Sequence, residues 1–403
     1  MTMTIDNEHK NNQGRKVLNA PNLRFPEFQG EWEEKQLSEI ADLYKGNGIS
    51  KEQLSDSGAP CILYGELYTK YKSEVISEVV SKTNIDTKGL VRSKANDVII
   101  PCSGETAEDI ATARCVPYDN ILLGGDLNII RLHDIDGSFM SYQLNGQRKY
   151  DIAKVAQGVS VVHLYGEHLK GVKTYVPCID EQKKIAKLLS LLDDRIATQN
   201  KVIEDLKKLK SAIIEKLYKG IQGTWYSYRQ LFSIINERNK QLEYSNVLSA
   251  SQERGMVSRE DLNLDIQFDR SNISTYKIVK NGDYVIHLRS FQGGFAFSEK
   301  TGICSPAYTV LRPNNLLVYG YLSNYFTSKD FVKSLIIVTY GIRDGRSINV
   351  DEWLDMKVVI PSKEQQTHIV NVIESIENKI KNEEMYSNCL LNQKQYLLRQ
   401  MFI

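Results

Sequence analysis

The stretch VPCIDEQKKI at residues 176–185 returns as IPSKEQQTHI at residues 360–369. The two copies align without a gap at a shift of 184 residues, and the apolar positions stay in step beyond them. The matched pairs downstream are Leu188 with Val372, Leu189 with Ile373, Leu192 with Ile376, Ile196 with Ile380, and Leu206 with Leu390. Self-similarity at a fixed shift is the signature of a duplicated unit. The chain is therefore built twice.

Each copy continues into a heptad pattern, in which apolar residues recur at alternating steps of four and three. The first seam is Ile185, Leu189, Leu192, Ile196, Ile203, Leu206, Ile213 and Leu217. The second seam is Ile369, Ile373, Ile376, Ile380, Leu390, Leu397 and Met401. The polar interruptions are Gln199 and Lys210 in the first seam and Glu383, Ser387 and Lys394 in the second. Such a seam indicates a helix that packs against another helix.

The predicted helices are long for the domains they follow. About five heptads without an internal Gly or Pro, at about 1.5 Å per residue, give roughly 55 Å of helix. A domain of this size is only about 35–40 Å across. We therefore expect the two helices to pack on each other, and a pseudo-twofold relation between the halves would make the pair antiparallel.

The regions that precede the helices diverge from each other but open alike. The expected equivalences are Trp32 with Trp225, Leu37 with Leu231, Ile40 with Ile234, and Asp97 with Asp283. Short strand-type runs at residues 61–64, 97–100, 128–132, 283–286 and 308–311 alternate with polar loops. The sequence predicts an α+β fold with a polar tail (1–20), a variable domain (21–176), a central helix (177–220), a second variable domain (221–359) and a C-terminal helix (360–403).

Composition narrows the functional classes. The chain has 51 basic and 50 acidic residues, so its net charge of +1 argues against coating nucleic acid through bulk charge. The six cysteines form no Cys-x-x-Cys pair, which argues against a zinc ribbon or a dithiol redox motif. No apolar run is long enough to cross a bilayer and the N-terminus is polar, so we expect a cytoplasmic protein with no membrane partner.

The loops of both variable domains are rich in Tyr, Ser, amide and basic side chains, which suit a polar binding surface. Arg and Lys pair with phosphate or guanine, Asn and Gln with adenine, and hydroxyls with phosphate or base edges. The DNA-binding candidates are Lys45, Asn47, Lys51, Tyr64, Tyr68, Lys70, Ser103, Thr106, Arg289, Ser290, Gln292, Tyr308, Tyr340, Arg343 and Arg346. Each could equally be a solvated surface side chain, and loop composition alone does not separate DNA from a protein or sugar ligand.

No catalytic motif emerges from the sequence. Ser305-Pro306-Ala307-Tyr308 is similar to the motif with which amino-methyltransferases hold the target amine, but it lacks the second Pro, and no Gly-rich turn for S-adenosylmethionine accompanies it. There is no phosphate-binding loop. Asp205 and Lys207 have part of a nuclease pattern but belong to the heptad helix, where a surface charge pair is expected. The six histidines form no metal motif, so the residues offer no motif for a metal, a cofactor or catalysis.

Two divergent domains alternating with two similar helices, each introduced by Pro-x-x-x-Glu/Gln-Gln (177–182 and 361–366), resemble the specificity subunit of type I restriction-modification enzymes. The opening at residues 22–32, NLRFPEFQGEW, is also similar to first-domain openings in that family. The resemblance covers essentially the whole chain from about Pro21.

This resemblance implies that each variable domain is a target-recognition domain that reads one half of a bipartite site in double-stranded DNA. The helices would set the spacer between the half-sites and dock the modification subunits. The subunit itself is not an enzyme. It would direct two modification subunits, which methylate adenine with S-adenosylmethionine, and two restriction subunits, which use ATP and Mg to translocate and cleave DNA.

Two other functions remain open from the residues alone. The chain could be a protein-binding scaffold with a coiled-coil arm, in which case cells that carry it would show no bipartite methylation motif. It could also be a self-contained amino-methyltransferase that uses residues 305–308, which would require the isolated chain to bind S-adenosylmethionine.

Overall fold

The computed structural model describes residues 19–158, 161–251, 254–262, 270–287, 294–340 and 347–403. The chain divides into two compact units. The first comprises residues up to 200 together with 385–403, and the second comprises residues 201–384. Because this division runs through both long helices, the predicted boundaries of the variable domains stay a prediction.

The first unit is built on a four-stranded antiparallel sheet with strand order β2-β10-β6-β8. A second sheet, β3-β5-β4-β9, lies in the same unit, and β1 pairs with β12, and β7 with β11. The strands are β1 (Glu33–Gln36), β2 (Ala41–Lys45), β3 (Leu54–Ser55), β4 (Ala59–Ile62), β5 (Ser81–Thr83), β6 (Asp97–Pro101), β7 (Ser103–Gly104), β8 (Arg114–Val116), β9 (Leu122–Leu123), β10 (Leu127–Leu132), β11 (Val162–His163) and β12 (Lys173–Val176). The short helices are α1 (Leu37–Ile40), α2 (Glu66–Thr69), α3 (Ala107–Ile110), α4 (Gly137–Asn145), α5 (Lys149–Val155) and α6 (Gly166–Leu169).

The second unit repeats this plan with a four-stranded sheet of order β14-β21-β18-β19. Its β13 pairs with β24 as β1 pairs with β12. The strands are β13 (Thr224–Ser227), β14 (Phe232–Ile235), β15 (Leu248–Ser251), β16 (Gly255–Ser258), β17 (Lys277–Val279), β18 (Tyr284–Ile286), β19 (Phe295–Phe297), β20 (Gly302–Cys304), β21 (Thr309–Pro313), β22 (Thr339–Tyr340), β23 (Ser347–Ile348) and β24 (Lys357–Ile360). The short helices are α8 (Tyr228–Leu231), α9 (Tyr321–Tyr325), α10 (Lys329–Ser334) and α11 (Val350–Asp355). The predicted α+β class and internal repeat are confirmed.

One predicted equivalence is confirmed by its contacts. Asp97 receives both guanidinium bonds of Arg131, at 2.9 and 2.8 Å, and Asp283 receives both from Arg312, each at 2.8 Å. The residue before each aspartate has a positive φ, 82° at Asn96 and 93° at Gly282. In both units this bidentate ion pair joins the central two strands of the sheet.

The predicted alignment of the two openings is wrong by three residues. Leu37 begins α1 and Tyr228, not Leu231, begins α8. The mismatch arises because the two tryptophans have different roles. Trp32 is buried just before β1, whereas Trp225 lies within β13, at the position equivalent to Glu34, and is exposed.

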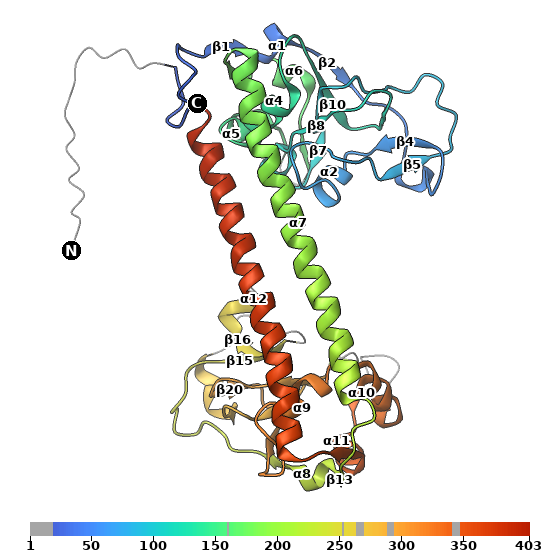
Figure 1. Cartoon of the computed structure of the whole chain (residues 1–403), viewed down its shortest axis with the longest axis vertical. Helices are drawn as coiled ribbons and strands as arrows, with labels where there is room; N and C mark the ends of the chain where they lie inside the picture. The colour runs from blue at the N-terminus through green and yellow to red at the C-terminus, as the bar shows by residue number, and fades with distance from the viewer. Residues whose placement is uncertain (1–18, 159–160, 252–253, 263–269, 288–293, 341–346) are drawn as a thin grey trace, which may run out of the picture. The chain divides into compact units, whose positions relative to one another are not determined.

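The two long helices are α7 (Ile179–Tyr218) and α12 (Lys363–Gln400). They run antiparallel in both units, because residue numbers rise along α7 while the numbers of the α12 residues that they contact fall. Figure 1 shows them side by side. Buried seam residues in the first unit are Ile185, Leu189, Leu192, Ile196 and Leu390, and those in the second are Ile203, Ile369, Ile373 and Ile380. Half-buried ones are Leu206, Ile213, Leu217, Ile376 and Leu397.

A buried glutamine joins each long helix to its domain. In the first unit, Gln182 donates to the carbonyl of Pro177 at 2.8 Å and accepts from the backbone N–H of Asp136 at 2.9 Å. In the second, Gln366 donates to the carbonyl of Pro361 at 3.1 Å and accepts from the N–H of Val318 at 2.8 Å. The last glutamine of the repeated motif therefore fixes the direction in which each helix leaves its domain.

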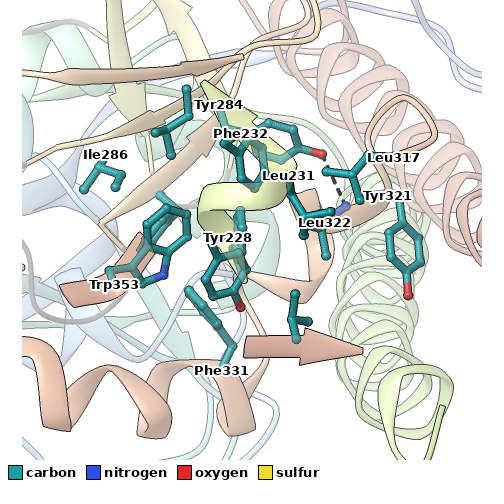
Figure 2. Close-up of a cluster of buried hydrophobic side chains, with 14 of the residues drawn as sticks. Tyr228, Leu231, Phe232, Tyr284, Ile286, Leu317, Tyr321, Leu322, Phe331 and Trp353 are labelled. Atoms are coloured by element: carbon teal, nitrogen blue, oxygen red, sulfur yellow. Dashed lines mark hydrogen bonds between the residues drawn. The ribbon is translucent and has the colours of Figure 1, made fainter. Parts of the chain in front are cut away.

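Each unit buries the beginning of one long helix and the end of the other. In the first unit, Ile185 and Leu189 of α7 pack with Phe402, which follows α12, around Trp32 and Phe139. In the second, Ile369 and Ile373 of α12 pack with Ile214 of α7 in a large aromatic core. Figure 2 shows part of that core, where Trp353 stacks on Tyr228 with ring centroids 4.3 Å apart. Ile214, which the seam prediction omits, is thus a core residue.

A buried ionic cluster in the first unit links both long helices to the sheet domain. The ammonium of Lys394 in α12 contacts Asp193 in α7 at 2.6 Å and also contacts Glu74. Asp193 accepts a further bond of 2.7 Å from the hydroxyl of Tyr142. Burial raises the pKa of the Glu74 carboxyl, and the Lys394 ammonium opposes this rise. Only 12% of the Lys394 side chain is exposed, and its single ammonium is shared by two desolvated carboxylates.

We expect Lys394→Met to destabilise the chain by about 3–5 kcal/mol, because it removes the ammonium that both buried carboxylates contact. Lys210 is the matched control. It pairs with Glu377 at 2.6 Å in the second unit, but both side chains are more exposed, so Lys210→Met should cost about 0–1 kcal/mol. Urea denaturation of both variants measures the difference, and equal losses of stability would contradict this account.

Candidate nucleic-acid interface

Three segments of the first unit meet at the end of β6. The hydroxyl of Tyr68, in α2, donates to the backbone carbonyl of Ser103 at 2.9 Å. Ser103 lies in β7, which pairs with β11, and its Oγ is 3.3 Å from Nδ1 of His163. The structure thus brings together two of the predicted residues, Tyr68 and Ser103, with His163, which the prediction omits.

Aromatic and polar groups are displayed beside this junction. The ring of Tyr165, which is 51% exposed, lies nearly parallel to the imidazole of His163, with ring centroids 6.2 Å apart. Burial raises the pKa of Tyr68, so its phenol stays a neutral donor at physiological pH. Hydroxyl, imidazole and exposed aromatic groups are the kinds of side chain that contact phosphates and base edges.

Three more candidates of the first unit lie at its surface. Lys45 ends β2, and its ammonium is 3.7 Å from Asp126, a distance at which the exposed pair is weak. Lys51 is exposed at the start of a short 3-10 helix, Lys51–Gln53. Tyr64 is exposed just after β4. These side chains can turn toward a ligand with little loss of internal bonding.

The remaining candidates of the first unit hold loops in place. The amide of Asn47 donates to the carbonyl of Gly89 at 3.0 Å and accepts from the N–H of Val91 at 2.9 Å. Thr106 caps α3 by accepting from the backbone of Asp109. Lys70 pairs with the buried Glu66 at 2.7 Å. Their bonds shape the surface on which the other candidates stand.

In the second unit, most candidates lie outside the described residues: Arg289, Ser290, Gln292, Arg343 and Arg346. The backbone of Tyr340 is described in β22, which pairs with β23. Tyr308 is half-buried, and its ring centroid lies 6.1 Å from that of His287. Its carbonyl accepts a 2.7 Å bond from Lys277.

The repeat places some of the candidates of both units on corresponding segments of sequence. Because Asp97 corresponds to Asp283, the segment from Ser103 to Thr106 after β6 corresponds to residues 289–292 after β18. At the 184-residue shift, His163 corresponds to Ser347, next to Arg346. Two segments in each half therefore correspond, one after an inner sheet strand and one before α6 or α11, and in the second half they hold every candidate except Tyr308.

This correspondence identifies functional candidates that composition alone misses. His163 and Tyr165 were not predicted, because neither stands in a basic or Gly-rich loop. The signal that could have found His163 is the repeat itself, since the segment predicted at residues 340–347 has its counterpart at 156–163, and Tyr165 lies two residues beyond that counterpart. His163 and Tyr165 join Lys45, Lys51, Tyr64, Tyr68 and Ser103 as the first-unit face.

Two negative searches apply to the part of the chain that the structure describes. Among those residues, no three His, Cys, Asp or Glu side chains are grouped so that they could hold a metal ion. None of the described helices combines the length and apolar character required to cross a membrane.

Comparison with known proteins finds a family and a relative of similar sequence. Residues 29–208 match the family described as the type I restriction modification DNA specificity domain. The chain is 25% identical over 402 positions to the specificity subunit of the type I restriction enzyme MjaVIII from Methanocaldococcus jannaschii, covering 89% of this chain and 88% of that subunit.

Two solved structures share the fold. One is the S subunit of a type I restriction-modification system from M. genitalium, with a TM-score of 0.55, 16% identity, and coverage of 95% of this chain and 99% of that one. The other comes from work on complex assembly and conformational transition of the type I R-M system, with a TM-score of 0.58, 14% identity, and coverage of 92% and 97%. Residues 29–208 therefore carry a DNA specificity domain of the type I restriction-modification kind, and the repeat, the paired helices and the two solved structures extend the fold of these specificity subunits over the rest of the chain.

Proposed function

We propose that the chain reads a bipartite DNA site, with one recognition domain (21–176) reading one half-site and the other (221–359) reading the second. The observation that carries this proposal is that the two units repeat one sheet topology, one bidentate Asp–Arg pair and one helix junction, but differ in their loops. A repeated scaffold with different loops is what reading two different half-sites requires, because base-edge contacts carry the specificity.

The first-unit face supplies the chemistry for the first half-site. Its hydroxyls and imidazole bond phosphates or base edges, and its two exposed lysines contact phosphate. The corresponding residues Arg289, Gln292, Arg343 and Arg346 supply guanine- and adenine-pairing groups for the second half-site. Residues 1–176 include 20 basic and 24 acidic residues, so we expect phosphate contacts of the partner subunits to contribute much of the affinity.

The long helices set the distance between the half-sites in this proposal. A helix of 40 residues, such as α7, is about 60 Å long. This length supports a spacer that is set by the helices, because the heptad seam pairs α7 with α12 in both units.

The modification subunits dock on the helix pair. An apolar groove in the first unit supports this step and is lined by Leu188, Leu191, Leu192, Arg195, Tyr386, Cys389, Leu390, Gln393 and Leu397. Leu191 is 52% exposed, although it lies in a long helix beside a well-packed seam. Exposed apolar side chains in a groove between two helices suit an amphipathic helix from a partner.

Two modification and two restriction subunits complete the proposed assembly. They bring S-adenosylmethionine for adenine methylation and ATP with Mg for translocation and cleavage, and the chain itself contributes sequence choice. The assembly works in the cytoplasm, where it meets genomic DNA.

Single-molecule sequencing tests the proposal by comparing methyladenine positions in cells that contain the cognate modification and restriction subunits, with and without this chain. A gapped motif that depends on the chain is expected and would give both half-sites. Absence of any new motif would instead favour a protein-binding scaffold with a coiled-coil arm.

The docking step predicts a separate effect. Leu191→Asp should weaken assembly with the modification subunit at least about thirtyfold, because burying the new carboxylate in the groove is costly. Lys187→Asp is the control, since it places the same side chain at an exposed position of α7 outside the groove. Sedimentation of the mixed subunits measures both, and equal weakening by the two variants would count against docking in this groove.

A further inference from the structure

Of the ion pairs that cross between α7 and α12, two lie at equivalent places. In the first unit, Asp193 of α7 meets Lys394 of α12 at 2.6 Å. In the second, Glu377 of α12 meets Lys210 of α7, also at 2.6 Å. The 184-residue shift equates Asp193 with Glu377 and Lys210 with Lys394. Each copy of the helix therefore carries one acid and one base, and each acid meets the base of the other copy.

The two pairs differ in burial. The side chains of Asp193 and Lys394 are 7% and 12% exposed, whereas those of Glu377 and Lys210 are 41% and 26% exposed. A neutral polar contact accompanies the buried pair, because Ser387 donates to the side-chain oxygen of Asn200 at 3.0 Å, one heptad from Asp193. Polar contacts thus cross the seam in both units.

The apolar seam alone leaves the register ambiguous. Ile and Leu recur every seven residues, so a shift of one heptad would place aliphatic side chains against aliphatic side chains again. The two ion pairs would be broken by that shift. A one-heptad slip would bring Ser387 or Met401 opposite Asp193, so its carboxylate would lose the ammonium that neutralises it. Buried polar residues are known to specify register in paired helices in this way.

We propose that Asp193–Lys394 and Glu377–Lys210 are positioning pairs that fix the register of α7 against α12, and thereby the one spacer length at which the two half-sites are read. This inference rests on the proposed function, because it assumes that the helix pair sets the spacer. It assigns the register to four named residues rather than to the apolar seam.

Charge reversal of the more exposed pair tests this assignment with little risk of unfolding. Lys210→Glu alone and Glu377→Lys alone each place like charges together, and the double variant restores an opposite-charge pair. Lys208→Met is the control, because Lys208 pairs with Glu204 on its own helix and contacts no residue across the seam. Each chain is expressed with the cognate subunits, and genomic methyladenine is mapped.

Each single reversal should permit a one-heptad slip of about 10 Å, and should therefore raise methylation at least tenfold over the unchanged chain at sites whose spacer is about three base pairs longer or shorter. The double variant and Lys208→Met should keep the original single spacer. Rescue by the double variant separates register from simple loss of stability. A single unchanged spacer in both reversals, with both half-sites still methylated, would overturn the inference while leaving the proposed function intact.

A measurement without DNA makes the register visible directly. In a Cys389→Ser background, cysteines at positions 200 and 387 should form a disulfide readily, since the native side chains are in contact. Lys210→Glu should slow this cross-link at least tenfold, and the double reversal should restore it. A cross-linking rate unaffected by the reversals would overturn the inference even if the proposed function failed.

Discussion

The antiparallel contact between α7 and α12 is the constraint on which the rest of the molecule depends. Each unit completes its core with the beginning of one helix and the end of the other, so neither sheet domain is closed by its own helix alone. In the first unit, the C-terminal Phe402 packs among Trp32 and Phe139. Deleting the end of the chain therefore removes part of the core of the domain that begins it.

Two sets of polar contacts give the helix pair a defined geometry. Gln182 and Gln366 fix where each helix leaves its sheet domain, because each amide bonds the backbone on both sides of the junction. The cross-helix ion pairs then choose one alignment among those that the repetitive seam permits. The junction is specified by hydrogen bonds, the alignment by charge, and the stability of the pair by aliphatic burial.

The sequence was most informative where the determining pattern is local. The repeat and the two heptad seams are read from neighbouring residues, and the structure confirms the long helices. Ile214 was missed because α7 ends in an aromatic core, so its last turns present a wider apolar face than a seam predicts. The openings were misaligned because Trp32 and Trp225 look alike in sequence but lie two positions apart in equivalent segments, the first buried just before its strand and the second exposed within its strand.

The candidate interface was less predictable, because its contacts join distant residues. Composition selected Tyr68 and Ser103, but it could not show that they meet His163. It also selected Asn47 and Thr106, whose polar groups bond nearby backbone. Residue type indicates what a side chain could bind, whereas only the folded chain shows which of its bonds are already made.

Lengthening both helices together tests the account most directly. One heptad inserted after Asn200 and one after Glu384, which are equivalent through the repeat, would extend the pair by about 10 Å while keeping the seam in phase. Methylation mapping should then give the same two half-sites with a spacer longer by about three base pairs. An unchanged spacer, or an altered half-site, would contradict the claim that the helix pair sets the distance between the half-sites.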